Sequence, residues 1–136
     1  MNNLKIYDFY YIDYCYLTKL TDNVLKAYKH IKKLNVACEE KITNINHLKN
    51  LEILYVDNCD LCDEDIKGLD LIKLSVDYNP RITNLNNMTN LEFLSVGFSC
   101  GVSDNGVSSF KNLKLLHAIH NKKVTRNITV PGCRSE

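Results

Sequence analysis

The sequence predicts an α/β solenoid, in which short strands stack into one parallel sheet and the links between them cover its other side. Two observations carry this prediction. The pattern Φ-x-x-Φ-x-Φ, where Φ is an apolar residue, recurs along most of the chain. Its copies start at a spacing of 20 or 22 residues. Self-similarity at such a period is typical of repeat architectures.

Six copies of the pattern can be read along the chain. They are FYYIDY from Phe9, IKKLNV from Ile31, LEILYV from Leu51, LIKLSV from Leu71, LEFLSV from Leu91 and LKLLHA from Leu113. The segment 9–34 also aligns with the segment 91–116 without a gap. We therefore expect a single domain over residues 1–136, with repeats from about 9 to 124 and residues 125–136 as a tail or a weak C-terminal cap.

The last two Φ positions of each copy define a strand. Strand side chains alternate between two faces, so Leu54 and Val56 should point into the core. Ile53, Tyr55 and Asp57 should point to the opposite, concave face. A single repeat cannot bury its apolar side alone, so stability comes from stacking neighbours. We expect about six parallel strands, centred near Asp13, Asn35, Tyr55, Ser75, Ser95 and His117.

The links between the copies alternate in type. The longer links follow the first, third and fifth strands, and they open with Thr21-Asp22, Cys62-Asp63 and Ser103-Asp104. A short polar side chain can satisfy free backbone N–H groups at a helix start, so each long link should hold a short helix. The shorter links, KITNINHLKN and RITNLNNMTN, leave room for a 3₁₀ turn or an extended stretch. The convex side should alternate between short helices and coils.

These motifs resemble the leucine-rich repeat family over residues 9–124. The long links look like the cysteine-containing subtype, with the segment CGVSD from Cys100 as the nearest match. The short links are similar to the internalin-like and phosphatase-regulator subtypes. The resemblance implies the fold, but it says little about function because the family hosts many unrelated binders.

The resemblance also implies a ladder of turn residues three positions after the second Φ of each strand. The family usually places Asn or Cys there, with side chains that bond backbone groups in the turn. Cys59, Asn79 and Asn121 match this pattern, whereas Leu17, Glu39 and Ser99 depart from it. We therefore expect a regular but incomplete ladder.

Composition and charge limit the classes of partner. The formal net charge of +1 gives no global field to attract nucleic acid or an anionic membrane surface. The N-terminus does not read as a signal peptide, and no apolar run reaches the roughly 20 residues of a membrane-spanning helix. We expect six reduced cysteines in a cytoplasmic protein, the cytoplasm being that of the host cell if the chain is viral.

The candidate chemical sites are weak. Cys59-x-x-Cys62 lacks the second pair that a structural zinc site needs, and His117 and His120 should lie on different sides of the chain. Asp57 and Asp77 should be neighbours, but no nucleophile or ligand set accompanies them. An acidic patch that contacts a partner explains them better than a catalytic dyad. We expect no metal, no cofactor and no enzymatic activity.

The concave face is the strongest candidate for function. Exposed apolar and aromatic residues rimmed by charge are typical of protein interaction surfaces. The predicted partner-binding residues are Tyr11, Ile53, Tyr55, Asp57, Lys73, Asp77, Phe93, Leu115 and His117. An interaction module that binds a protein partner is the leading hypothesis. The alternative is a structural protein that self-associates through the solenoid ends into a larger particle or filament, since the polar C-terminal tail closes the last strand weakly.

Overall fold

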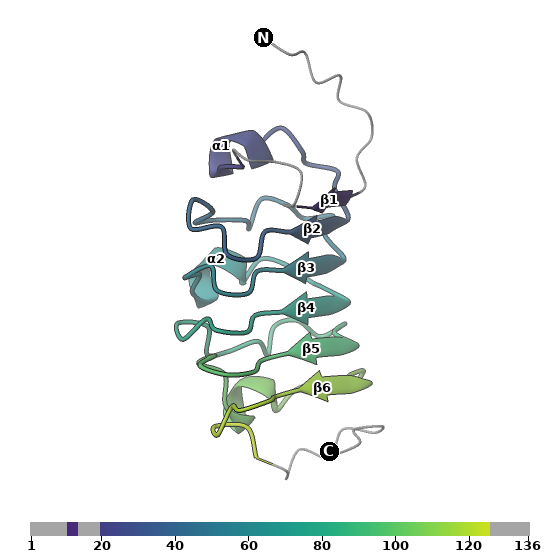
Figure 1. Cartoon of the computed structure of the whole chain (residues 1–136). Helices are drawn as coiled ribbons and strands as arrows, with labels where there is room; N and C mark the ends of the chain where they lie inside the picture. The colour runs from purple at the N-terminus through teal and green to yellow at the C-terminus, as the bar shows by residue number, and fades with distance from the viewer. Residues whose placement is uncertain (1–10, 14–19, 126–136) are drawn as a thin grey trace.

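The computed structural model describes residues 11–13 and 20–125, and its main feature is a single stacked sheet. The strands are β1 (Tyr11–Asp13), β2 (Lys33–Asn35), β3 (Ile53–Tyr55), β4 (Lys73–Ser75), β5 (Phe93–Ser95) and β6 (Leu115–His117). They follow one another in chain order, and each neighbouring pair is parallel. Figure 1 shows them as a column with the links on one side. The predicted parallel sheet in a stacked solenoid is confirmed.

The register of the sheet follows the repeat. Leu54 pairs with Leu34 on one side and with Leu74 on the other, and Leu94 continues the row. These leucines are the middle residues of their strands and are at most 3% exposed. The expected strand centres were therefore one residue too late: Tyr55, for example, is the last residue of β3 rather than its middle.

The core lies between the sheet and the links. The first Φ of each copy and the apolar link residues are buried together with the strand residues, as the repeat predicts: Ile31, Leu51, Leu71, Leu91, Ile45, Leu48, Leu85 and Met88. Burying one such side chain contributes about 1.5–3 kcal/mol to folding. Every coil contributes to the same continuous cluster, so the stability of each coil depends on its neighbours.

Within the described residues, three short helical segments lie in the links. They are α1 (Asp22–Leu25) after β1, α2 (Asp63–Ile66) after β3 and η2 (Asp104–Val107), a 3₁₀ helix, after β5. The Thr21 hydroxyl accepts a hydrogen bond from the Val24 amide, as expected of a helix cap. The Ser103 hydroxyl makes no such bond, and its link forms only the tighter helix. Between β2 and β3, and between β4 and β5, the chain forms turns.

The predicted turn ladder is confirmed at its three matching positions. The buried Asn79 amide donates to the carbonyls of Val56 and Val76, at 2.8 and 3.2 Å, and Asn121 donates to the Val96 carbonyl at 2.6 Å. The Cys59 thiol donates to the Val36 carbonyl at 3.0 Å. These bonds satisfy backbone carbonyls inside the turns, where water cannot reach them.

One departure from the ladder has a simple structural explanation. Ser99, which stands at the ladder position in the sequence, is exposed. Cys100 is 1% exposed, and its thiol approaches the Ile82 carbonyl at 4.0 Å. The turn after β5 therefore holds one extra residue, and Cys100 takes the inward position. This insertion accounts for part of the 22-residue spacing between the last two copies.

Candidate functional site

The candidate site is the side of the sheet that faces away from the core, which we call the sheet face. Its described residues are Lys33, Asn35, Ala37, Ile53, Tyr55, Asp57, Lys73, Ser75, Asp77, Phe93, Ser95, Gly97, Leu115, His117 and Ile119. It corresponds to the expected concave face. The strand positions on it are mostly half-buried, because neighbouring strands bring their side chains within contact distance.

Each predicted partner-binding residue with a described side chain lies on this face. Ile53, Lys73, Phe93 and Leu115 form one row across the strands, and their backbone positions are paired in register. His117 is exposed at the end of β6. Tyr11 lies in β1 in register with Lys33, but its side chain is outside the described part of the chain. The sheet therefore brings the predicted set together on one surface, apart from this side chain.

Lysine and aromatic side chains alternate diagonally across the sheet face. The Tyr55 ring lies between two ammonium groups, with Lys33 Nζ at 5.8 Å and Lys73 Nζ at 5.3 Å from its centroid. Lys73 Nζ also lies 6.0 Å from the centroid of the Phe93 ring. Such cation–π contacts contribute about 0.5–1 kcal/mol each at exposed sites. They favour the observed relative positions of the rings and charges of this row, which we call the cationic–aromatic row.

Asp57 and Asp77 form a second row, and their contacts are within the chain. Asp57 Oδ1 accepts hydrogen bonds from Ser75 Oγ at 2.6 Å and from the Asp77 amide at 2.8 Å. Asp77 Oδ1 accepts the equivalent bonds from Ser95 Oγ at 2.8 Å and from the Gly97 amide at 2.6 Å. Each carboxylate thus joins its own strand to the next one.

The two carboxylates lie in confined surroundings on the sheet face. Burial raises the pKa of Asp57 above its ordinary value of 3.8, although the bonds from Ser75 and the Asp77 amide oppose this shift. A Cβ at Gly97 would lie 3.3 Å from the Asp77 carboxylate and 3.0 Å from the Ile119 carbonyl, so glycine leaves room for the carboxylate. The sequence predicts that the two aspartates contact a partner by charge. Their role in holding the strands is evident from the contacts, and a role toward a partner stays a prediction.

The turns that follow β2 to β6 carry a feature that the sequence did not indicate. In each of them one equivalent residue has a positive φ, and these residues form a column that we call the turn edge: Cys38, Asn58, Tyr78, Phe98 and His120. Asp60, in the turn after β3, also has a positive φ. Asparagine tolerates this left-handed backbone conformation. The same conformation costs other side chains about 1–2 kcal/mol each. Tyr78 and Phe98, with φ of 58° and 56°, are bulky residues in a conformation that disfavours them.

The aromatic side chains of the turn edge contact one another. The rings of Tyr78 and Phe98 are stacked, with centroids 4.3 Å apart and planes 10° from parallel. Phe98 and His120 follow at 5.5 Å with a tilt of 50°. We call these three residues the aromatic ladder. The spacing of 20 and 22 residues between Tyr78, Phe98 and His120 was present in the sequence, but it gave no sign of a left-handed turn.

The chemistry-bearing side chains elsewhere are dispersed. Among the residues that the structure describes, no three His, Cys, Asp or Glu side chains form a group that could hold a metal ion. Burial raises the pKa of the Cys59 thiol to about 11, which keeps it protonated and unreactive at neutral pH. Cys62 lies at the start of α2, where its backbone N–H donates to the Asp65 carboxylate at 2.8 Å.

The comparisons with known proteins give no relative from which a function could be transferred. No protein-family model, no curated protein and no solved structure matches the chain significantly. Within the described part of the chain, no helix combines the length and apolar character that a membrane crossing requires.

Proposed function

We propose that this chain is a leucine-rich-repeat-like solenoid of six coils that binds a protein partner through its sheet face. In this proposal the coils alternate between helical and extended links, and the module is neither an enzyme nor a nucleic-acid or membrane binder. Cofactors are not required, and a cytoplasmic location follows from the expected reduced cysteines. The supporting observations are the stacked sheet and the composition of its outer face.

The cationic–aromatic row carries this proposal. Folding requires no aromatic side chain on the sheet face, since Ser75 and Ser95 occupy positions equivalent to Tyr55 there. Tyr55 and Phe93 instead provide large, amphipathic or apolar surfaces at the centre of the face. Their rings are already positioned by Lys73. Binding to such a surface costs little side-chain entropy, and central aromatic anchors usually dominate protein interfaces.

The row also suggests how a partner would be oriented. Lys73 lies between the two rings, so a partner carboxylate could pair with its ammonium group while apolar partner groups cover Tyr55 and Phe93. Ile53 and Leu115 extend the apolar area along the same row of the sheet. A charge on the rim mainly sets orientation and association rate, whereas the rings supply affinity.

Affinity capture with matched variants tests the proposal. Tyr55→Ala and Phe93→Ala should each reduce recovery of the partner, whereas Lys111→Ala, an exposed change in the link before β6, should leave it unchanged. Circular dichroism of each variant should show an intact fold. Full recovery by both sheet-face variants, with loss from Lys111→Ala, would place the interaction on the link side and refute the proposal.

Self-association through the ends of the solenoid is the second candidate. It is favoured by the last described coil, in which Leu116 is only partly buried and Ile119 is 58% exposed. A second copy stacked on this end would cover that apolar surface. Light scattering over a range of concentrations separates the two candidates, because a binding module stays monomeric and an assembly protein grows with concentration.

A further inference from the structure

The aromatic ladder at the turn edge differs from the rest of the column in which it lies. Five turns use the same left-handed backbone position. Asn58 makes that turn without a bulky side chain, so the geometry of the turn does not require a ring. In the last three described turns, the position instead carries Tyr78, Phe98 and His120. Aromatic residues held in an unfavourable conformation where asparagine would serve indicate selection for something other than folding.

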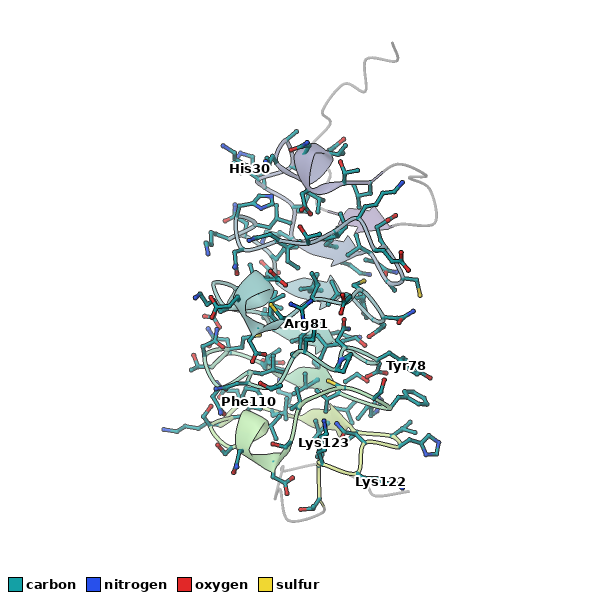
Figure 2. The ribbon with its side chains drawn as sticks, turned by 90° about the vertical axis from the view of Figure 1, so that its left-hand side faces the viewer. His30, Tyr78, Arg81, Phe110, Lys122 and Lys123 are labelled. Carbon is teal, nitrogen blue, oxygen red and sulfur yellow. The ribbon has the colours of Figure 1, made fainter. Side chains whose placement is uncertain are left out.

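The ladder is accessible and already ordered. Tyr78 is 44% exposed, Phe98 is half-buried, and His120 is exposed. Ile119, next to His120, adds an apolar side chain that is 58% exposed. Because the rings stack on one another, their positions are fixed before any partner arrives. Figure 2 shows Tyr78 at one edge of the molecule.

The charged residues near the C-terminal end of the ladder are cationic. Lys122 and Lys123 follow His120 after the buried Asn121, and both are exposed. Figure 2 shows Lys122 below Tyr78, toward the same edge of the molecule. The carboxylate of Asp77, which precedes Tyr78, accepts bonds from Ser95 and Gly97 on the neighbouring strand. Figure 2 shows Lys123 nearer the middle of this view, so Lys122 is the labelled lysine on the side of the molecule where Tyr78 lies.

We propose that the aromatic ladder docks an acidic peptide segment of a partner protein. An apolar or aromatic side chain of the segment would pack against Phe98 and Ile119, while a carboxylate pairs with Lys122. Apart from Ile119, which also belongs to the sheet face, this surface lies in the turns beyond the strands, so the proposal goes beyond binding at Tyr55 and Phe93. The aromatic ladder would be a second binding surface of the molecule, with an acidic peptide as its ligand.

A peptide fits the ladder better than single-stranded nucleic acid does. Bases bind proteins by stacking on free aromatic faces along a basic groove. Here the facing sides of Tyr78 and Phe98 are occupied by each other, 4.3 Å apart, so a base could not enter between them without breaking the stack. The net charge of +1 also provides little attraction for a polyphosphate backbone. Ring edges and one flanking cationic group suit a short acidic segment.

Selection from a random dodecapeptide display library against the immobilised whole chain tests this inference. We expect enrichment of peptides rich in Asp and Glu that contain an aromatic or large apolar residue. Fluorescence anisotropy with the enriched peptides, and with oligothymidine as the nucleic-acid probe, then measures affinity. The double variant Tyr78→Asn/Phe98→Asn should weaken peptide binding by roughly tenfold or more, as loss of central anchors does. Asparagine suits the left-handed turn, so this variant should melt no lower than the original chain.

Charge variants provide the second arm of the test. Lys122→Glu should weaken binding of the acidic peptides, whereas Lys111→Glu on a link and Tyr55→Ala on the sheet face should not. Three results would overturn the inference. They are the absence of enriched acidic peptides, equal binding by the asparagine double variant, and binding of oligothymidine that is tighter than peptide binding and lost in the same variant. Retained binding in Tyr55→Ala also separates this surface from the proposed sheet-face site.

Discussion

Asp63 Oδ2 accepts a hydrogen bond from Thr83 Oγ1 at 2.6 Å, and its Oδ1 accepts one from the Thr83 amide at 2.7 Å. The same two bonds join Asp22 to Thr43, in the first part of the described chain. They recur between Asp104 and Thr125. In each case the aspartate that begins a helical segment accepts two hydrogen bonds from the threonine of the following link. The coils are therefore clamped together on the link side as well as through the sheet.

Removing one of these clamps should destabilise the solenoid measurably. We expect Asp63→Ala to lower the free energy of unfolding by about 1–2 kcal/mol, since it deletes charge-assisted bonds to Thr83 at a partly exposed site. Urea unfolding followed by circular dichroism measures this. Glu64→Ala is the matched control, because Glu64 follows Asp63 in α2 and makes an exposed ion pair with Lys67. It should cost less than about 0.5 kcal/mol, and equal losses would refute the clamp.

The buried amide of Asn79 should be more important than its surface counterparts. Asn79→Ala removes the donor that satisfies the Val56 and Val76 carbonyls and the acceptor for the Cys59 amide. We expect a loss of at least about 2 kcal/mol, because those groups stay buried without partners. Asn87→Ala, at an exposed position that bonds a single carbonyl, should cost well under half as much. Similar melting temperatures for the two variants would contradict this account.

The cysteines should differ strongly in reactivity. Cys38 is exposed, whereas Cys59 is buried with its pKa raised to about 11 by burial. A thiol reagent with a mass-spectrometric readout should modify Cys38 quickly and Cys59 slowly in the native protein. We also expect rapid labelling of Cys133, which lies in the C-terminal tail outside the described residues. Equal rates at Cys38 and Cys59 would show that the turn after β3 opens readily.

The raised pKa of Cys59 also has a consequence for stability. A group whose folded-state pKa lies above its unfolded value stabilises the fold below the unfolded pKa and loses that contribution as pH rises. For Cys59 the loss should run from about the ordinary value of 9.0 towards 11. Unfolding titrations across this range should show a smaller decline for Cys59→Ser than for the original chain. An identical decline would mean that the thiol does not titrate differently in the folded state.

Adjacent residues of β3 should separate folding from function. Leu54 is fully buried and Leu54→Ala should cost about 2–5 kcal/mol by opening a cavity. Tyr55 lies on the sheet face, and Tyr55→Ala should cost about 1–2 kcal/mol, through the lost contacts with Lys33 and Lys73. Denaturant midpoints of the two variants test this contrast, and a larger loss for Tyr55→Ala would place its ring in the core.

The repeat pattern was sufficient to predict the strands and the core, because a Φ position such as Leu54 meets the same position of the next coil. The polar turn ladder was implied by the resemblance to leucine-rich repeats, and Asn79 indeed bonds Val56 of the preceding coil. The sheet-face residues were found from the repeat pattern as well, since strand alternation assigns every residue to one of two sides.

Contacts that depend on exact geometry were not predictable from the sequence. The bonds of Asp57 to Ser75 and to the Asp77 amide need the two strands at their true spacing, so the sequence pattern indicates an acidic patch but not these bonds. The left-handed backbone at Tyr78 and Phe98 was hidden, because aromatic residues give no turn signal. Only the folded backbone brings those two rings into one stack.

Photo-crosslinking tests the central claim, that the sheet face binds a protein partner, most directly. The photoreactive amino acid benzoylphenylalanine is placed at position 55 or, as the link-side control, at position 111, in the full chain within its native cells. The account predicts a discrete protein adduct from position 55 that is absent from position 111 and is lost when Phe93→Ala is added. An adduct from position 111 alone would contradict the account, as would adducts of the chain only with itself.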